Sequence, residues 1–175
     1  MGVCMKRPMI GVIGHSIHAR RIHLEVAEKI GKLIAKKGGI VVCGGRNVGV
    51  MDAVARGVKK EGGICIGILP ESDLSQASEH LTIAIPTGLG YARNQIVALA
   101  SDVVIVIGGG VGTLTEMAYA YNAGKPIIVI EGLDSIGEQF IGKYMDEKKK
   151  VKIRGVRTPE EAVELAFKLI EGKDA

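Results

Sequence analysis

The chain has 175 residues, a length that suits one continuous core, and we expect residues 1–175 to form a single domain. Its formal charge is only +4, and aromatic residues make up 3% of it, with no Trp. Both values disfavour a nucleic-acid-binding protein, which needs a strongly basic surface or rings on which bases stack. No apolar run approaches the length of a membrane span, and the first residues fit no secretion signal. We therefore expect a cytoplasmic protein without membrane attachment.

Short runs rich in β-branched residues alternate along the chain with longer segments of helical period. The runs predicted as strands are 10–13, 40–43, 64–69, 81–85, 103–107, 127–130 and 151–153. Several are apolar throughout, which is typical of strands covered on both faces in a parallel sheet. Helical spacing of apolar residues within 22–34 and 163–170 predicts covering helices. The fold class is therefore α/β, a doubly wound, mainly parallel, Rossmann-like sheet with helices on both faces, and ligands in such folds bind at the carboxyl ends of the strands.

Two connecting segments and the cysteines add further expectations. Segment 70–79 is polar and without period, which predicts a loop, and 131–149 is irregular.

The three cysteines are far apart and odd in number, and Cys43 and Cys65 lie within apolar runs, so we expect buried free thiols. No metal site is expected, because no Cys or carboxylate stands at ligand spacing from the histidines near the first strand. Those histidines are His15, His18 and His23.

The strongest local signal is a glycine turn that directly follows the 103–107 run and precedes a helical segment. It consists of Gly108, Gly109, Gly110, Gly112 and Thr113 around one valine. A strand, a glycine turn and a helix direct free backbone N–H groups and the positive end of the helix dipole at an anion, so we expect a phosphate to bind here. The turn is not a P-loop, since no Gly-Lys-Ser/Thr follows, and the spaced glycines of a dinucleotide fingerprint are absent after the first strand.

Glu116 follows Thr113 by three residues and admits two interpretations. In one, its carboxylate shares the anion-binding turn and takes part in function. In the other, Thr-x-x-Glu is a helix capping box, in which the glutamate only satisfies a backbone N–H group. The chain repeats the spacing at Thr158 and Glu161, ahead of a helix with no glycine turn. Spacing alone therefore leaves the role of Glu116 open.

Two further turns lie between predicted strands and helices. The first holds Gly44, Gly45, Arg46, Asn47 and, a little later, Met51; its glycines permit close approach of a ligand, Asn47 is placed to cap the helix, and Arg46 is placed to meet a phosphate. The second, 86–94, ends near Arg93, which is early enough in its helix to point at the same edge of the sheet. Three such turns at one edge predict a shared ligand site.

Over nearly its entire length the sequence resembles the LOG superfamily, whose Rossmann-like members were once misnamed lysine decarboxylases. The family's Pro-Gly-Gly-x-Gly-Thr-x-x-Glu signature is matched by Gly109, Gly110, Gly112, Thr113 and Glu116, with Gly108 in place of the proline. The family's arginine ahead of that signature is matched by Arg93. In cytokinin-activating members this Arg and Glu are the catalytic pair that removes ribose 5′-phosphate from a nucleoside monophosphate. The resemblance therefore implies a phosphoribohydrolase that needs no cofactor.

Departures from the pattern are similar to another branch of the superfamily. Gly108 in place of proline and Arg46 in place of a turn glycine resemble the molybdenum cofactor carrier proteins, which bind a phosphorylated pterin and need not hydrolyse it. The alternative is thus a non-catalytic carrier whose ligand is the molybdenum cofactor. A weaker resemblance is to DNA-processing relatives of the DprA type. In the two main cases the expected partner is a nucleotide-like small molecule, and the resemblance implies a homodimer or a higher homo-oligomer.

Overall fold

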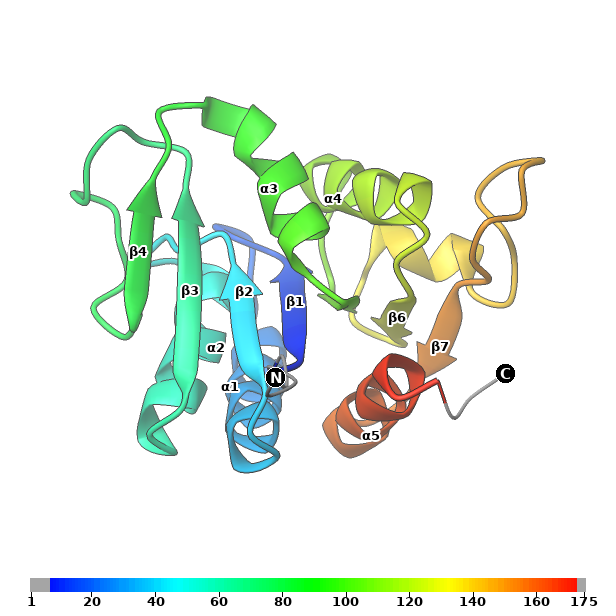
Figure 1. The fold of residues 1–175 in the computed structure, drawn as a ribbon, viewed down its shortest axis with the longest axis horizontal. Coiled ribbons are helices and arrows are strands. Elements are labelled where there is room, and N and C mark those ends of the chain that lie inside the picture. Colours follow the sequence, from blue (N-terminus) through cyan, green and yellow to red (C-terminus); the bar gives the residue numbers. More distant parts are fainter. Residues whose placement is uncertain (1–6, 173–175) are drawn as a thin grey trace, which may run out of the picture.

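The computed structural model describes residues 7–172, and its centre is one seven-stranded sheet in which all paired strands are parallel. The strands are β1 (Met9–Gly14), β2 (Ile40–Cys43), β3 (Ile64–Leu69), β4 (Ile83–Pro86), β5 (Val103–Ile107), β6 (Ile127–Ile130) and β7 (Arg154–Val156). Their order across the sheet is β4-β3-β2-β1-β5-β6-β7, which leaves β4 and β7 at the two edges (Figure 1). The predicted fold class is confirmed.

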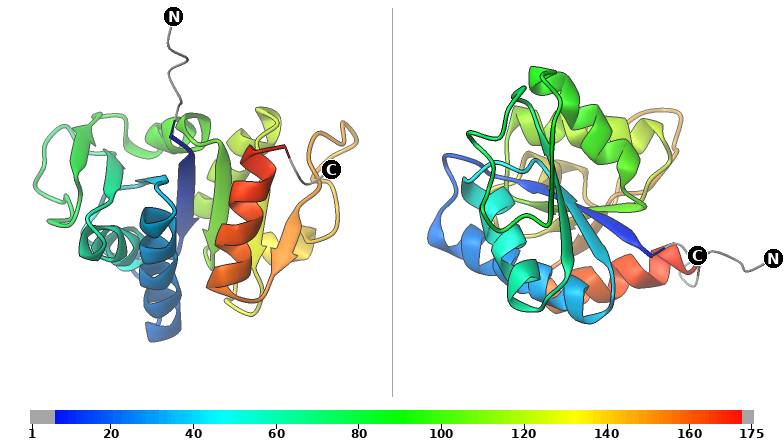
Figure 2. Two further views of the ribbon diagram at one scale, coloured as in Figure 1. Left: turned by 60° about the horizontal axis from the view of Figure 1, so that its bottom comes forward. Right: turned by 60° about the vertical axis from the view of Figure 1, so that its left-hand side comes forward.

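Helices cover both faces of the sheet and enclose two separate apolar cores. The helices are α1 (Arg21–Lys36), α2 (Gly49–Lys60), η1 (Gly90–Ala92), α3 (Arg93–Ala100), α4 (Val111–Asn122), η2 (Ile136–Phe140) and α5 (Pro159–Ile170). One core joins α1, α2 and α5 to the sheet, and the other joins α3 and α4 to the opposite face (Figure 2). The interior strand β5 is buried at every position, because successive side chains enter the two cores alternately.

Four predicted strands, β2, β3, β5 and β6, have the predicted bounds, and two others are displaced. The strand expected over 81–85 begins at Ile83, and the one expected over 151–153 is observed at Arg154–Val156. Ile153 is fully buried, but its backbone bonds Gly142 and Lys143 of the preceding loop instead of β6. Ile153 is therefore a buried loop residue, and the strand is formed by the three residues that follow it.

The polar segment 70–79 is a loop, as predicted, and several hydrogen bonds hold it against the turn after β2. The N–H of Asn47 donates to the Gln76 carbonyl (2.9 Å), and the N–H of Ser78 donates to the Gly45 carbonyl (2.9 Å). The Ser78 hydroxyl donates to Asp52 on α2 (2.7 Å). This loop is consequently bonded to the turn after β2 through its backbone and to α2 through the Ser78 hydroxyl.

Cys43 and Cys65 are buried free thiols, as predicted, with 3.9 Å between their sulfur atoms. The third cysteine, Cys4, lies outside the described residues. In residues 7–172 no helix has the length and apolar character that crossing a membrane requires. The same part of the chain contains no group of three or more His, Cys, Asp or Glu side chains that could hold a metal ion.

Candidate functional site

The turns that follow β1, β2, β4 and β5 meet at the carboxyl edge of the sheet and enclose a cavity of about 270 Å³. This volume is close to the lower end of the range for small-molecule sites, about 300–1,000 Å³. The cavity is lined by Val12, Ile13, Gly14, His15, Ser16, Ile17, His18, Gly44, Arg46, Met51, Tyr91, Arg93, Asn94, Gly110, Gly112, Thr113 and Glu116. It lies beside β1, the point where the chain passes from one half of the sheet to the other, and this is where doubly wound folds bind ligands.

The glycine turn after β5 leaves the first turn of α4 open to the cavity. Gly108 and Gly109 have φ values of +65° and +105°, a conformation that favours glycine, and this bend directs the chain into α4. Side chains attached at Gly110 and Gly112 would meet no atom within 4 Å, so both positions face open space.

The N–H groups of 110–113 donate no hydrogen bond within the described part of the chain, while Leu114 already bonds the Gly110 carbonyl (2.9 Å). These groups and the helix dipole form a donor site for an anion.

Glu116 is not a helix-capping residue. The N-cap of α4 is Gly110, which has no side-chain cap, so Thr113 and Glu116 lie inside the helix. The matching pair at α5 is a true capping box: the Glu161 carboxylate accepts from the N–H of Thr158 (3.1 Å), and the Thr158 hydroxyl accepts from Glu161 (3.2 Å). Tertiary position therefore gives the same spacing two different roles.

The Glu116 carboxyl lies in the cavity wall, with only 8% of the residue exposed and no hydrogen bond to any described residue. Burial raises its pKa to about 8, against an opposing effect of the Arg93 charge. At neutral pH Glu116 is therefore mostly a neutral acid, which both donates and accepts hydrogen bonds.

Arg93 is the first residue of α3, and its guanidinium bonds the backbone rather than Glu116. One terminal nitrogen donates to the carbonyls of Gly44 and Ile68, the latter at 2.7 Å. Its Nε is buried without a partner among the described residues. Gly44 leaves room for the guanidinium, which a Cβ at that position would overlap. Arg93 thus fixes the turn after β2 against the end of β3 and places positive charge in the cavity wall.

The turn after β2 contributes fewer cavity residues than the sequence predicted. Gly44, Arg46 and Met51 line the cavity, but Gly45 and Asn47 do not. Asn47 is also not the cap of α2, whose N-cap is Val48 without a side-chain cap. The Nε and one terminal nitrogen of Arg46 bond Glu71, so two of its donors are already used. Gly109 likewise does not line the cavity; its carbonyl accepts from Ile136 (2.9 Å), and its role is to turn the chain.

The structure also gives roles to residues outside the glycine turns and the Arg–Glu pair. Asn94 is buried, and its amide donates to the Thr115 hydroxyl (3.0 Å), which joins the start of α3 to the first turn of α4. His23 does not line the cavity: its Nδ1 accepts from the N–H of Arg20 (2.8 Å), and its Nε2 bonds the Leu133 carbonyl (2.9 Å). His15 packs against the His23 ring with 4.7 Å between centroids, so His23 supports the cavity wall from behind.

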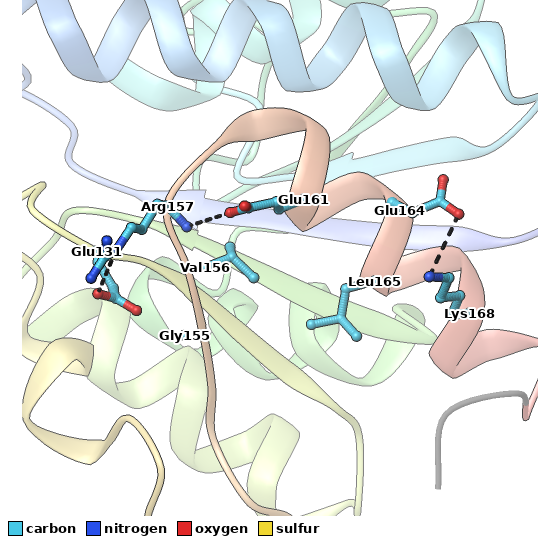
Figure 3. Close-up of a pocket in the computed structure, with 8 residues that line it drawn as sticks. All are labelled: Glu131, Gly155, Val156, Arg157, Glu161, Glu164, Leu165 and Lys168. Carbon is cyan, nitrogen blue, oxygen red and sulfur yellow. Dashed lines mark hydrogen bonds and ion pairs between the residues drawn. The ribbon is translucent and has the colours of Figure 1, made fainter.

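A larger hollow of about 470 Å³ lies between β7 and α5 and lacks these features (Figure 3). Its charged side chains are paired with one another: Arg157 with Glu131 (3.8 Å) and Lys168 with Glu164 (4.0 Å), while the N–H of Arg157 donates to Glu161 (2.8 Å). The unpartnered donors and the buried acid are all at the smaller cavity, which is therefore the candidate site.

Comparison with known proteins identifies the family. The sequence profile of the SLOG cluster4 family matches residues 7–163. The chain belongs to this family. The predicted resemblance to the LOG superfamily is thereby confirmed.

Two solved structures resemble this SLOG cluster4 protein over nearly their whole lengths. A molybdenum cofactor binding protein from Rippkaea orientalis is 40% identical, with a TM-score of 0.85 and coverage of 95% of this chain and 99% of that chain. The molybdenum cofactor carrier protein of Chlamydomonas reinhardtii is 33% identical, with a TM-score of 0.82 and coverage of 96% and 100%. By sequence, a cytokinin riboside 5′-monophosphate phosphoribohydrolase of Mycobacterium tuberculosis is 35% identical over 116 residues, which are 62% of each protein.

Proposed function

We propose that this protein binds a phosphate-bearing heterocyclic molecule at the carboxyl edge of its sheet and carries the molybdenum cofactor without hydrolysing it. The observation that carries the non-catalytic part is the similarity over almost the whole chain to two molybdenum cofactor proteins, whereas the M. tuberculosis phosphoribohydrolase matches over 62% of it. N-glycosidic hydrolysis uses an ionised carboxylate to stabilise an oxocarbenium-like transition state or to activate water. Glu116 is buried, and burial raises its pKa to about 8, which disfavours the ionised form at neutral pH. The protonated form suits hydrogen bonding to a ligand, and it cannot supply the negative charge that this catalytic role needs.

The cavity residues fit a phosphorylated pterin as cargo. The open N–H groups at the first turn of α4 suit the phosphate, because Gly110 and Gly112 leave room for its approach. The amide-like edge of a pterin carries both donors and acceptors, and a neutral Glu116 matches either kind. The R. orientalis and C. reinhardtii proteins, named for the same cofactor, support this assignment through their similarity over almost the whole chain.

The test is co-purification of cargo from a host that makes the cofactor. Wild-type protein is expected to retain a pterin that mass spectrometry and the fluorescence of its oxidised derivative detect. Gly112→Asp places a carboxylate in open space beside the phosphate site, where an acidic residue does not destabilise the helix, and is expected to lose the pterin. Gly112→Ala tests bulk without charge, and Gln95→Asp adds the same charge at an exposed position outside the cavity. Absence of pterin from the wild type, or its retention by Gly112→Asp, contradicts the proposal.

A second candidate function is phosphoribohydrolase activity on nucleoside 5′-monophosphates. It is favoured by one specific observation: Arg93, Glu116 and the first turn of α4, the residues shared with the LOG signature, line the same cavity. Catalysis would require ionised Glu116, so the rate of base release should rise with pH through about 8. The assay measures free base from a panel of monophosphates at pH 7 and pH 9, with Glu116→Gln as control. No release at either pH, or equal release by the variant, excludes this function.

A further inference from the structure

The large apolar side chains that are most exposed in the described part of the chain all surround the candidate site. Tyr91, Ile17 and Val111 are 89%, 79% and 72% exposed, and the next most exposed, Leu74, reaches only 55%. Tyr91 and Ile17 line the cavity, and Val111 stands between two glycines that line it. Clusters of exposed apolar side chains mark places where another molecule binds.

These three side chains come from three different turns around one hollow. Ile17 lies between β1 and α1, Tyr91 belongs to η1, and Val111 begins α4. A contact between copies of the chain generally uses a continuous face, such as the exposed Ile96 and Leu99 of α3, which do not line the cavity. An apolar rim on a concave site instead fits the apolar part of the molecule that enters it.

The positions of the rim residues relative to the anion site are fixed by hydrogen bonds. Asn94, three residues after Tyr91, bonds Thr115 in the first turns of α4 (3.0 Å), which holds η1 beside the N–H donors. On the other side, the N–H of His15 donates to the Ile107 carbonyl (3.2 Å), which holds the turn containing Ile17 beside the end of β5. Tyr91 and Ile17 therefore lie in segments that are bonded to α4 and to the end of β5, the two elements that the glycine turn joins.

We propose that Tyr91 stacks on the flat heterocyclic ring of a ligand whose phosphate binds at the first turn of α4, with Ile17 packing against the same ring. The inference rests on the proposed function, because it needs an anion at that turn. A purine nucleotide and a phosphorylated pterin share this chemistry, a flat ring joined to a phosphate. Stacking of a base on an aromatic side chain is strong enough to change affinity by about tenfold.

Calorimetric titration separates the ring from the phosphate. Ribose 5-phosphate carries the phosphate without a ring, and AMP and hydroxymethylpterin phosphate add the two kinds of ring. Tyr91→Ala is expected to weaken binding of at least one ring-bearing ligand by about tenfold and to leave the dissociation constant of ribose 5-phosphate within about twofold. Tyr91→Phe keeps the ring and is expected to retain wild-type affinity. The ligand that loses more affinity identifies the source of the ring.

Several outcomes overturn the inference. Unchanged affinity of Tyr91→Ala for both ring-bearing ligands, while the wild type binds ribose 5-phosphate, refutes stacking and leaves the anion site standing. An equal loss for all three ligands shows damage to the whole site rather than to a ring contact. A change of oligomeric state by light scattering with unchanged affinity shows that a second copy covers Tyr91. Failure of the wild type to bind ribose 5-phosphate refutes the anion site itself, and the stacking proposal with it.

Discussion

Replacing Glu116 with Gln should stabilise the protein, and the gain should depend on pH. The amide has the shape of the protonated acid but cannot ionise. Burial raises the pKa of Glu116 from 4.5 to about 8, so the folded protein holds this proton more tightly than the unfolded chain. The stability that comes from binding the proton is full below pH 4.5 and is lost as the pH rises through about 8.

The magnitude follows from the two pKa values. Each pH unit between them corresponds to 1.36 kcal/mol. The folded wild type is therefore penalised by less than about 1 kcal/mol at pH 5, by about 3 kcal/mol at pH 7 and by about 5 kcal/mol well above pH 8, and Glu116→Gln removes that penalty. The gain at pH 7 should raise the urea midpoint by about 1–3 M.

Urea titrations at pH 5, 7 and 9, followed by far-ultraviolet circular dichroism because the chain has no Trp, measure the difference. The matched control is Glu161→Gln, the second Thr-x-x-Glu glutamate. Backbone N–H groups of Arg157 and Thr158 lower the pKa of Glu161, so its contribution is present at neutral pH and lost as the pH falls. Glu161→Gln should thus destabilise the protein at pH 7. A Glu116→Gln effect that is the same at pH 5 and pH 9 refutes the argument.

Three further substitutions, one of them with a matched control, test the local structure by urea midpoint. Gly109→Ala should cost at least about 1–3 kcal/mol, because φ is +105° and the new carbon would overlap Thr113, whereas Gly112→Ala should fold normally. Thr158→Ala should cost about 1 kcal/mol through loss of the α5 cap, and a neutral result would show that the cap is dispensable. Arg93→Met should cost roughly 2–3 kcal/mol, since it leaves two buried carbonyls without their donor; wild-type stability would contradict that bonding.

Much of the fold was predictable because its strands are short apolar runs between strong turn signals. The bounds of β2, β3, β5 and β6 match the prediction, since a strand covered on both faces has no polar residues to obscure its ends. The edge strand β7 was placed incorrectly. Its residues are half-buried, and of the residues 151–153 predicted in its place only Ile153 is buried, with its backbone bonded to a loop instead of β6. Edge strands lack the two-sided burial that makes a central strand recognisable.

The amino-acid sequence by itself determined the parallel α/β sheet, the carboxyl edge as the place of the candidate site, and the glycine turn ahead of α4. These features depend on local backbone preferences and on the period of apolar residues. Only the tertiary structure decided the roles of identical local patterns: Glu161 caps a helix, while Glu116 is buried in a cavity wall. It also decided that Arg93 bonds backbone carbonyls and that Tyr91 is exposed at the same cavity. Burial, pKa and hydrogen-bond partners arise from residues distant in the chain, and local spacing carries no information about them.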